Sequence, residues 1–109
     1  MKSYTDIEQS EKLAEILPIE SADMSWVSNG LGKPFARTIS IKGDPEELCA
    51  CWSLAALLDV LDRGASFKTS QGWACQVYIG PKAIISNYHS NPIDACVEII
   101  SELHKQKLI

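Results

Sequence analysis

The sequence predicts a single α+β domain over residues 1–109, with about three helices covering an antiparallel sheet of about four or five strands in a helix–sheet–helix layout. Two observations lead to this class. Apolar residues recur at three- and four-residue spacing in three separate stretches, which is the period of an amphipathic helix. After Gly64 the period changes to two, which is typical of strands. A length of 109 residues is enough for one hydrophobic core but not for two.

The composition is that of a folded globular domain, with 46% hydrophobic and 22% charged residues. The net charge of -4 argues against nucleic-acid binding, because neutralising phosphates supplies most of that affinity. No apolar run approaches the roughly 20 residues of a membrane helix. The first six residues lack the apolar segment of a signal peptide. We therefore expect a cytoplasmic protein that makes no membrane contact and keeps its cysteines reduced.

The first helix is expected to begin at Thr5 and to end near Leu17. Thr5 and Glu8 have the spacing of a capping box, in which a hydroxyl and a glutamate satisfy the first turn. Pro18 ends the helix, because the residue before a proline disfavours helical geometry. Glu8 and Lys12 have the order and spacing of an ion pair along the helix surface.

Two strands are expected to follow, over residues 24–27 and 35–41. The second alternates between larger and smaller side chains. The loop between them contains two glycines and a proline, which favour a break in regular structure.

The most apolar stretch of the sequence, residues 51–61, predicts a central helix that must be covered on most of its surface. Asp44 and the proline after it have the pattern of a helix cap and first residue, so this helix is expected to span residues 45–63. The alternative is a break near Cys51, with a separate helix beginning at Trp52-Ser53.

Residues 66–70, 73–79 and 82–88 then predict a three-stranded antiparallel meander. Asn91 and Pro92 have the positions of a cap and first-turn residue for the last helix. The inward stripe of this helix is expected to contain Ile93, Cys96, Val97, Ile100 and Leu103.

Three blocks of the sequence resemble small, uncharacterised bacterial proteins associated with prophages and mobile elements. They are KLAEILP at 12–18 running on to ADM at 22–24, CWSLAALL at 51–58, and NPIDACV at 91–97. The layout is also similar to the phage ABA sandwich family, which has a helix–sheet–helix design. The resemblance implies an origin and a layout, and it brings no catalytic residue.

No motif of the sequence predicts a catalytic residue, a cofactor or a metal site. Cys49 and Cys51 are the only closely spaced cysteines, and on a helix their side chains would point about 200° apart. All four cysteines are therefore expected to be buried thiols. Neither His89 nor His104 has a local nucleophile signature.

Three carboxylates of the last helix, those of Asp94, Glu98 and Glu102, recur every four residues. Such a stripe can bind metal only when it faces inward. Because it lies opposite the apolar face, we expect a solvated surface.

The aromatic residues Trp26, Trp73 and Tyr78 lie on predicted strands, where they are either core residues or an exposed patch for a partner. The favoured hypothesis is a small non-enzymatic accessory protein of a phage or mobile element. It would act by protein–protein contact, with an unknown partner or as a homodimer. The alternative is a small ligand-binding module or enzyme whose pocket lies near Trp26, Trp73 and His89.

Overall fold

The computed structural model describes residues 1–28, 32–38, 47–61 and 64–109. These residues form helices and two three-stranded antiparallel sheets, so the predicted α+β class is confirmed. The strands divide between two sheets, whereas a single sheet was expected. In chain order the elements are α1 (Ile7–Ala14), the 3-10 helix η1 (Ile19–Ser21), β1 (Met24–Val27), β2 (Phe35–Thr38), β3 (Glu47–Cys51), α2 (Leu54–Val60), β4 (Gly64–Thr69), β5 (Gly72–Ile79), β6 (Lys82–Ile85) and α3 (Pro92–Lys105).

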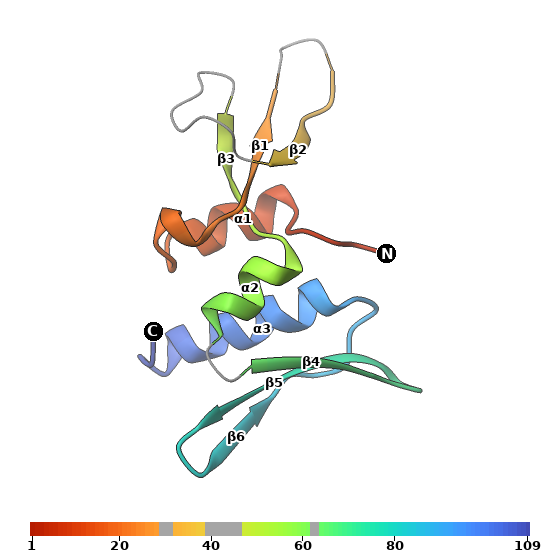
Figure 1. The fold of residues 1–109 in the computed structure, drawn as a ribbon, viewed down its shortest axis with the longest axis vertical. Coiled ribbons are helices and arrows are strands. Elements are labelled where there is room, and N and C mark those ends of the chain that lie inside the picture. The colour runs from red at the N-terminus through yellow and green to blue at the C-terminus, as the bar shows by residue number, and fades with distance from the viewer. Residues whose placement is uncertain (29–31, 39–46, 62–63) are drawn as a thin grey trace.

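The molecule is elongated, with extents of 47 × 30 × 20 Å. Figure 1 shows the β2-β1-β3 sheet at one end, the helices in the middle and the β4-β5-β6 sheet at the other end. Helix α3 lies between α2 and the β4-β5-β6 sheet (Figure 1). The helices therefore join two sheets that do not share a strand.

Helix α1 begins one residue later than predicted. Its cap is Asp6, whose carboxylate accepts a hydrogen bond from the Gln9 backbone at 2.7 Å. The Gln9 side chain accepts one from the Asp6 backbone at 3.2 Å, so the capping box contains these two residues in place of Thr5 and Glu8. The helix ends at Ala14, and its Glu8 forms no ion pair with Lys12.

Thr5 does not cap the helix because its groups are used in a buried junction. Its backbone N–H donates to the Trp52 carbonyl at 2.9 Å, and its hydroxyl accepts from the Trp52 N–H at 3.1 Å. The same hydroxyl lies 2.7 Å from that of Ser10. The Thr5 carbonyl accepts from the indole of Trp26 at 3.0 Å and from the Cys51 thiol at 3.4 Å. One residue thus joins α1, β1 and the end of β3.

Residues 47–51 form a strand, so the predicted helix over residues 45–63 is wrong in its first part. Strand β3 pairs antiparallel with β1, with Trp26 opposite Cys49. The break considered near Cys51 is present, since Ser53 caps α2 and its hydroxyl accepts from the Ala56 N–H at 3.2 Å. Pairing with β1 outweighs local helix propensity here. The predicted cap at Asp44 lies outside the described residues.

The predicted meander and last helix are confirmed. Strands β4, β5 and β6 are adjacent in that order, and the Asn91 side chain caps α3 by accepting from the Asp94 N–H at 2.9 Å. Gly72 has a φ of +127°, and a Cβ there would lie 2.7 Å from the His89 carbonyl oxygen. Only glycine fits this position without strain.

A single hydrophobic core joins the helices to the β4-β5-β6 sheet. Its largest fully buried side chain is that of Trp52, which lies between β3 and α2. The core also contains fully buried residues from each packed layer: Leu13 of α1, Leu57 of α2, Cys75 of β5, and Ile93 and Ile100 of α3.

We expect Leu57→Asp to unfold the protein. Leu57 is fully buried, and an unpaired carboxylate there costs several kcal/mol, against a total stability of about 5–15 kcal/mol. The matched control is Ala55→Asp, because Ala55 is exposed on the same helix. Thermal unfolding followed by circular dichroism tests the pair. A Leu57→Asp variant that melts with the wild-type transition would place Leu57 outside the core.

We expect Thr5→Val to lower the free energy of unfolding by about 1–3 kcal/mol, because the buried Trp52 N–H loses its acceptor. Valine keeps the branched shape and removes the hydroxyl. Thr38→Val is the control, since Thr38 is exposed on β2. Urea unfolding measures both, and equal losses for the two variants would contradict the role given to the Thr5 hydroxyl.

Candidate functional site

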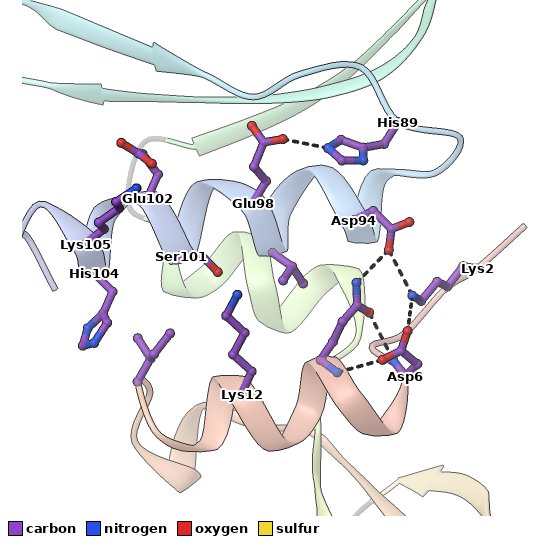
Figure 2. A pocket seen from close by; sticks show the side chains of 13 residues that line it. Lys2, Asp6, Lys12, His89, Asp94, Glu98, Ser101, Glu102, His104 and Lys105 are labelled. Atoms are coloured by element: carbon purple, nitrogen blue, oxygen red, sulfur yellow. Dashed lines mark hydrogen bonds and ion pairs between the residues drawn. The ribbon is translucent and has the colours of Figure 1, made fainter.

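A polar groove runs between α1 and α3, and we call it the interhelix groove. It has a volume of about 770 Å³, and its lining includes Lys2, Lys12, His89, Asp94, Glu98 and Ser101. Figure 2 shows that these side chains come from the N-terminal segment, from both helices and from the segment before α3. A volume of this size is typical of small-molecule sites.

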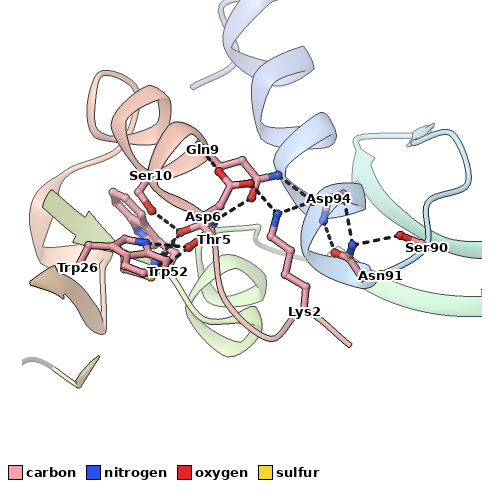
Figure 3. Close-up of polar contacts among 11 residues, drawn as sticks. Lys2, Thr5, Asp6, Gln9, Ser10, Trp26, Trp52, Ser90, Asn91 and Asp94 are labelled. Carbon is pink, nitrogen blue, oxygen red and sulfur yellow. Dashed lines mark hydrogen bonds and ion pairs between the residues drawn. The ribbon is translucent and has the colours of Figure 1, made fainter. Parts of the chain in front are cut away.

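A hydrogen-bonded network closes the groove where α1 and α3 begin (Figures 2 and 3). The Lys2 ammonium lies 2.9 Å from an Asp6 carboxylate oxygen and 3.0 Å from one of Asp94. Asp94 also accepts from the Gln9 amide at 2.8 Å and from the Asn91 amide at 2.9 Å. Because these partners come from different elements, the network fixes the position of α1 relative to α3.

The network shifts the protonation equilibria of its members. Partial burial raises the pKa of Asp94, but hydrogen bonds from Gln9, Lys2 and Asn91 outweigh it, so the pKa lies below its ordinary value. Burial lowers the pKa of Lys2, but bonds to Asp6 and Asp94 leave it raised. Both groups therefore stay charged at neutral pH.

Glu98 of α3 holds His89, which lies in the segment before that helix. The two side chains lie 2.9 Å apart, from Nε2 to Oε1, and Glu98 also accepts from the Asn87 backbone at 2.8 Å and side chain at 3.2 Å. Partial burial raises the pKa of Glu98, but these bonds outweigh it and the pKa is lowered. Among the described serines, threonines and cysteines, none hydrogen-bonds to the imidazole. Within the described residues, the pair therefore does not form the Ser–His or Cys–His hydrogen bond that is typical of nucleophilic catalysis.

The carboxylate stripe of α3 is not the freely solvated surface that was expected. The side chains of Asp94 and Glu98 are 31% and 33% exposed, and both are held by hydrogen bonds. Glu102 accepts from the Gln106 amide at 2.9 Å. All three residues line the interhelix groove. Periodicity within α3 contains no information about the segments that border this groove.

A second surface is the side of the β4-β5-β6 sheet that faces away from α3. Cys75 contacts Cys96 of α3, and Ser66 lies 3.5 Å from the same thiol, so these residues point inward. The strand register then places a second set of side chains on the opposite side. We call this set the outer sheet face: Ala65, Phe67, Ala74, Gln76, Tyr78, Ala83 and Ile85.

The outer sheet face is apolar and carries no charge. Tyr78 and Ile85 are 52% and 56% exposed, and Gln76 supplies its polar amide. In Figure 1 the helices lie on the other side of this sheet. The alternation of Ala74, Gln76 and Tyr78 against Cys75 and Val77 was visible in the sequence, but which side the helices cover was not.

The structure does not bring Trp26, Trp73 and His89 together. Trp26 lies in the other sheet, where its ring packs edge-on against Tyr4 at 5.7 Å and its indole N–H bonds to Thr5. Trp73 and His89 pair through their backbones, with N···O distances of 2.8 Å in both directions. Of the three candidates, His89 lines the interhelix groove.

The expected burial of the thiols is confirmed for Cys51, Cys75 and Cys96, whereas Cys49 is half-buried. Cys49 and Cys51 lie on a strand, where residues two apart share a side, so the helical argument against a shared metal does not apply. Even so, the described histidines, cysteines and acidic residues form no group of three or more that could hold a metal ion. A hydrogen bond with Cys96, together with burial, raises the pKa of Cys75, which stays a protonated core thiol.

No protein-family model, curated protein or solved structure matches this chain. The resemblance to prophage-associated proteins therefore stays a prediction. None of the helices in the described part of the chain is both long enough and apolar enough to span a membrane.

We expect Asp94→Asn to lower the free energy of unfolding by about 1 kcal/mol at pH 7, since the variant loses its ion pair with Lys2. The folded-state pKa of Asp94 is depressed, so its contribution is present above the unfolded value of 3.8 and is lost as pH falls below it. Urea unfolding at pH 7 and pH 3 should therefore show a difference that shrinks in acid. Asp59→Asn, at an exposed site on α2, is the control. A difference independent of pH would contradict this account.

Proposed function

We propose that this chain is a small, non-enzymatic, cytoplasmic accessory protein that acts through protein–protein contact, with the outer sheet face as its contact surface. The observation that carries the proposal is that this face is mostly apolar, is free of charge and exposes Tyr78 and Ile85, whereas Ala74 at its centre is buried. Apolar patches of this kind mark interaction sites on otherwise soluble domains. An origin in a prophage or mobile element is the part of the proposal that rests on the sequence resemblance.

The partner that this face fits is a second copy of the chain. In a symmetric dimer, both copies contribute the same surface to the interface. A charged residue near the symmetry axis would therefore lie close to the identical charge of the other copy and be repelled by it. The chain has a net charge of -4, and two copies repel unless they meet through a neutral surface. The outer sheet face is such a surface.

The area of the face sets the strength of the pairing. The sheet has three strands, of six, eight and four residues, which at about 3.3 Å per residue and about 4.8 Å between strands give a surface of roughly 290 Å². Stable interfaces bury about 800 Å² on each partner. We therefore expect a weak, reversible dimer.

The test is sedimentation velocity over a range of protein concentrations with Ile85→Lys and Ile19→Lys. Ile85 lies on the outer sheet face and is 56% exposed, whereas Ile19 is 58% exposed in η1. The wild type and Ile19→Lys should associate as concentration rises, and Ile85→Lys should remain monomeric. A wild-type chain that stays monomeric at millimolar concentration contradicts the dimer, and pairing by Ile85→Lys contradicts its location.

The alternative function is a ligand-binding module with a pocket near Trp26, Trp73 and His89. Of these three residues, His89 supports it. His89 lines the interhelix groove, whereas Trp26 belongs to the other sheet. The groove itself is the observation that favours this candidate.

A further inference from the structure

Two thiols from different elements meet in the core, those of Cys75 on β5 and Cys96 on α3. Both residues are fully buried and belong to the same hydrophobic core. The S–H group of Cys75 donates a hydrogen bond to the sulfur of Cys96, where β5 packs on α3. A disulfide can form only between thiols that face each other at close range. This pair meets that condition although the two residues are distant in the chain.

Cys96 is the more reactive thiol of the two. The hydroxyl of Ser66 on β4 lies 3.5 Å from its sulfur. The hydrogen bond from Cys75, together with that from Ser66, outweighs burial, so the pKa of Cys96 lies below its ordinary value. The bond with Cys96 and burial raise the pKa of Cys75. Because the thiolate is the reactive form of cysteine, Cys96 is the nucleophile and Cys75 is its protonated partner.

The route from solvent to this pair passes β4. Ser66 is half-buried, whereas Cys96 is fully buried. Strand β4 lies at an edge of the β4-β5-β6 sheet, so it is hydrogen-bonded to a single neighbouring strand. Local opening of such an element needs much less free energy than unfolding of the whole domain. A movement of β4 away from α3 therefore admits a small oxidant to the Cys96 sulfur.

We propose that Cys75 and Cys96 are a redox-responsive pair, which hydrogen peroxide converts into a disulfide that locks β5 to α3. The Cys96 thiolate attacks one peroxide oxygen, the O–O bond breaks, and the hydroxide that leaves takes up the proton that Cys96 had released. Cys96 is then a sulfenic acid. The Cys75 sulfur attacks the Cys96 sulfur, the S–O bond breaks, and the second hydroxide leaves as water with the Cys75 proton.

The two thiols thus lose two electrons and two protons, and one peroxide is reduced to two waters. The pair faces inward from the β4-β5-β6 sheet, so it is separate from the outer sheet face and does not depend on dimer formation.

The experiment treats the native chain with hydrogen peroxide, blocks the remaining thiols and digests it with trypsin without reduction. Trypsin cleaves after lysine and arginine, so Cys75 falls in the peptide 69–82, Cys96 in the peptide 83–105, and both Cys49 and Cys51 in the peptide 43–63. Mass spectrometry should find peptides 69–82 and 83–105 joined, and dithiothreitol should separate them.

The same treatment in urea should give a mixture of pairings, because unfolding separates the thiols. An equal mixture from the native chain would overturn the proposal. So would a native chain in which millimolar peroxide oxidises Cys49 and joins no peptides.

Variants test the order of the two steps. Cys75→Ser and Cys96→Ser should each abolish the joined peptides, whereas Cys49→Ser, at a half-buried thiol, is the control and should give the wild-type yield. In Cys75→Ser the sulfenic acid on Cys96 has no thiol to attack it, so dimedone should label the peptide 83–105. Labelling of the peptide 69–82 in Cys96→Ser would contradict the assignment of Cys96 as the nucleophile. Circular dichroism establishes that each variant is folded, and the peptide map of the wild type is decisive without them.

The disulfide should raise the unfolding temperature of the wild type by about 10 °C, because it restricts the unfolded chain between residues 75 and 96. Thermal unfolding before and after peroxide treatment measures this shift, and Cys96→Ser should show none. Joined peptides without a rise in unfolding temperature would overturn the lock between β5 and α3. The sedimentation of the untreated chain tests the outer sheet face separately.

Discussion

The burial of α3 is the constraint on which the rest of the structure depends. Eight of its fourteen residues are buried, more than one apolar stripe would require, because α2 packs on one side and β5 on the other. Removing this apolar surface from water is the main favourable term in folding. Since both layers share α3, the helices and the β4-β5-β6 sheet form one core that contains Leu57, Cys75 and Ile100.

Both candidate sites follow from what α3 leaves uncovered. Its polar side lines the interhelix groove, where Asp94 accepts a hydrogen bond from Gln9 of α1. Its apolar side covers one face of the β4-β5-β6 sheet, so the outer sheet face, with Tyr78 and Ile85, stays exposed. The first surface is lined by charged side chains of both signs, and the second by uncharged and mostly apolar ones. The two surfaces therefore differ in chemistry.

The differences between prediction and structure occur where a residue is used by a distant segment. Thr5 has the local pattern of a cap, but its hydroxyl accepts from the Trp52 N–H, and Asp6 caps α1 in its place. Residues 47–51 continue the apolar pattern of a helix, but they pair with β1. Pairing with β1 depends on a strand more than twenty residues earlier, and such contacts override local propensity.

The sequence by itself determined the α+β class, the β4-β5-β6 meander and the cap and apolar stripe of α3, because these depend on periodicity and on side chains near in the chain. Only the tertiary structure decided that β3 is a strand, that the strands form two sheets and that Lys12 lies near Ser101. The hydrophobic period of a helix or strand shows which of its sides is apolar, but it does not show which other element packs on that side. The positions of both candidate surfaces depend on this packing.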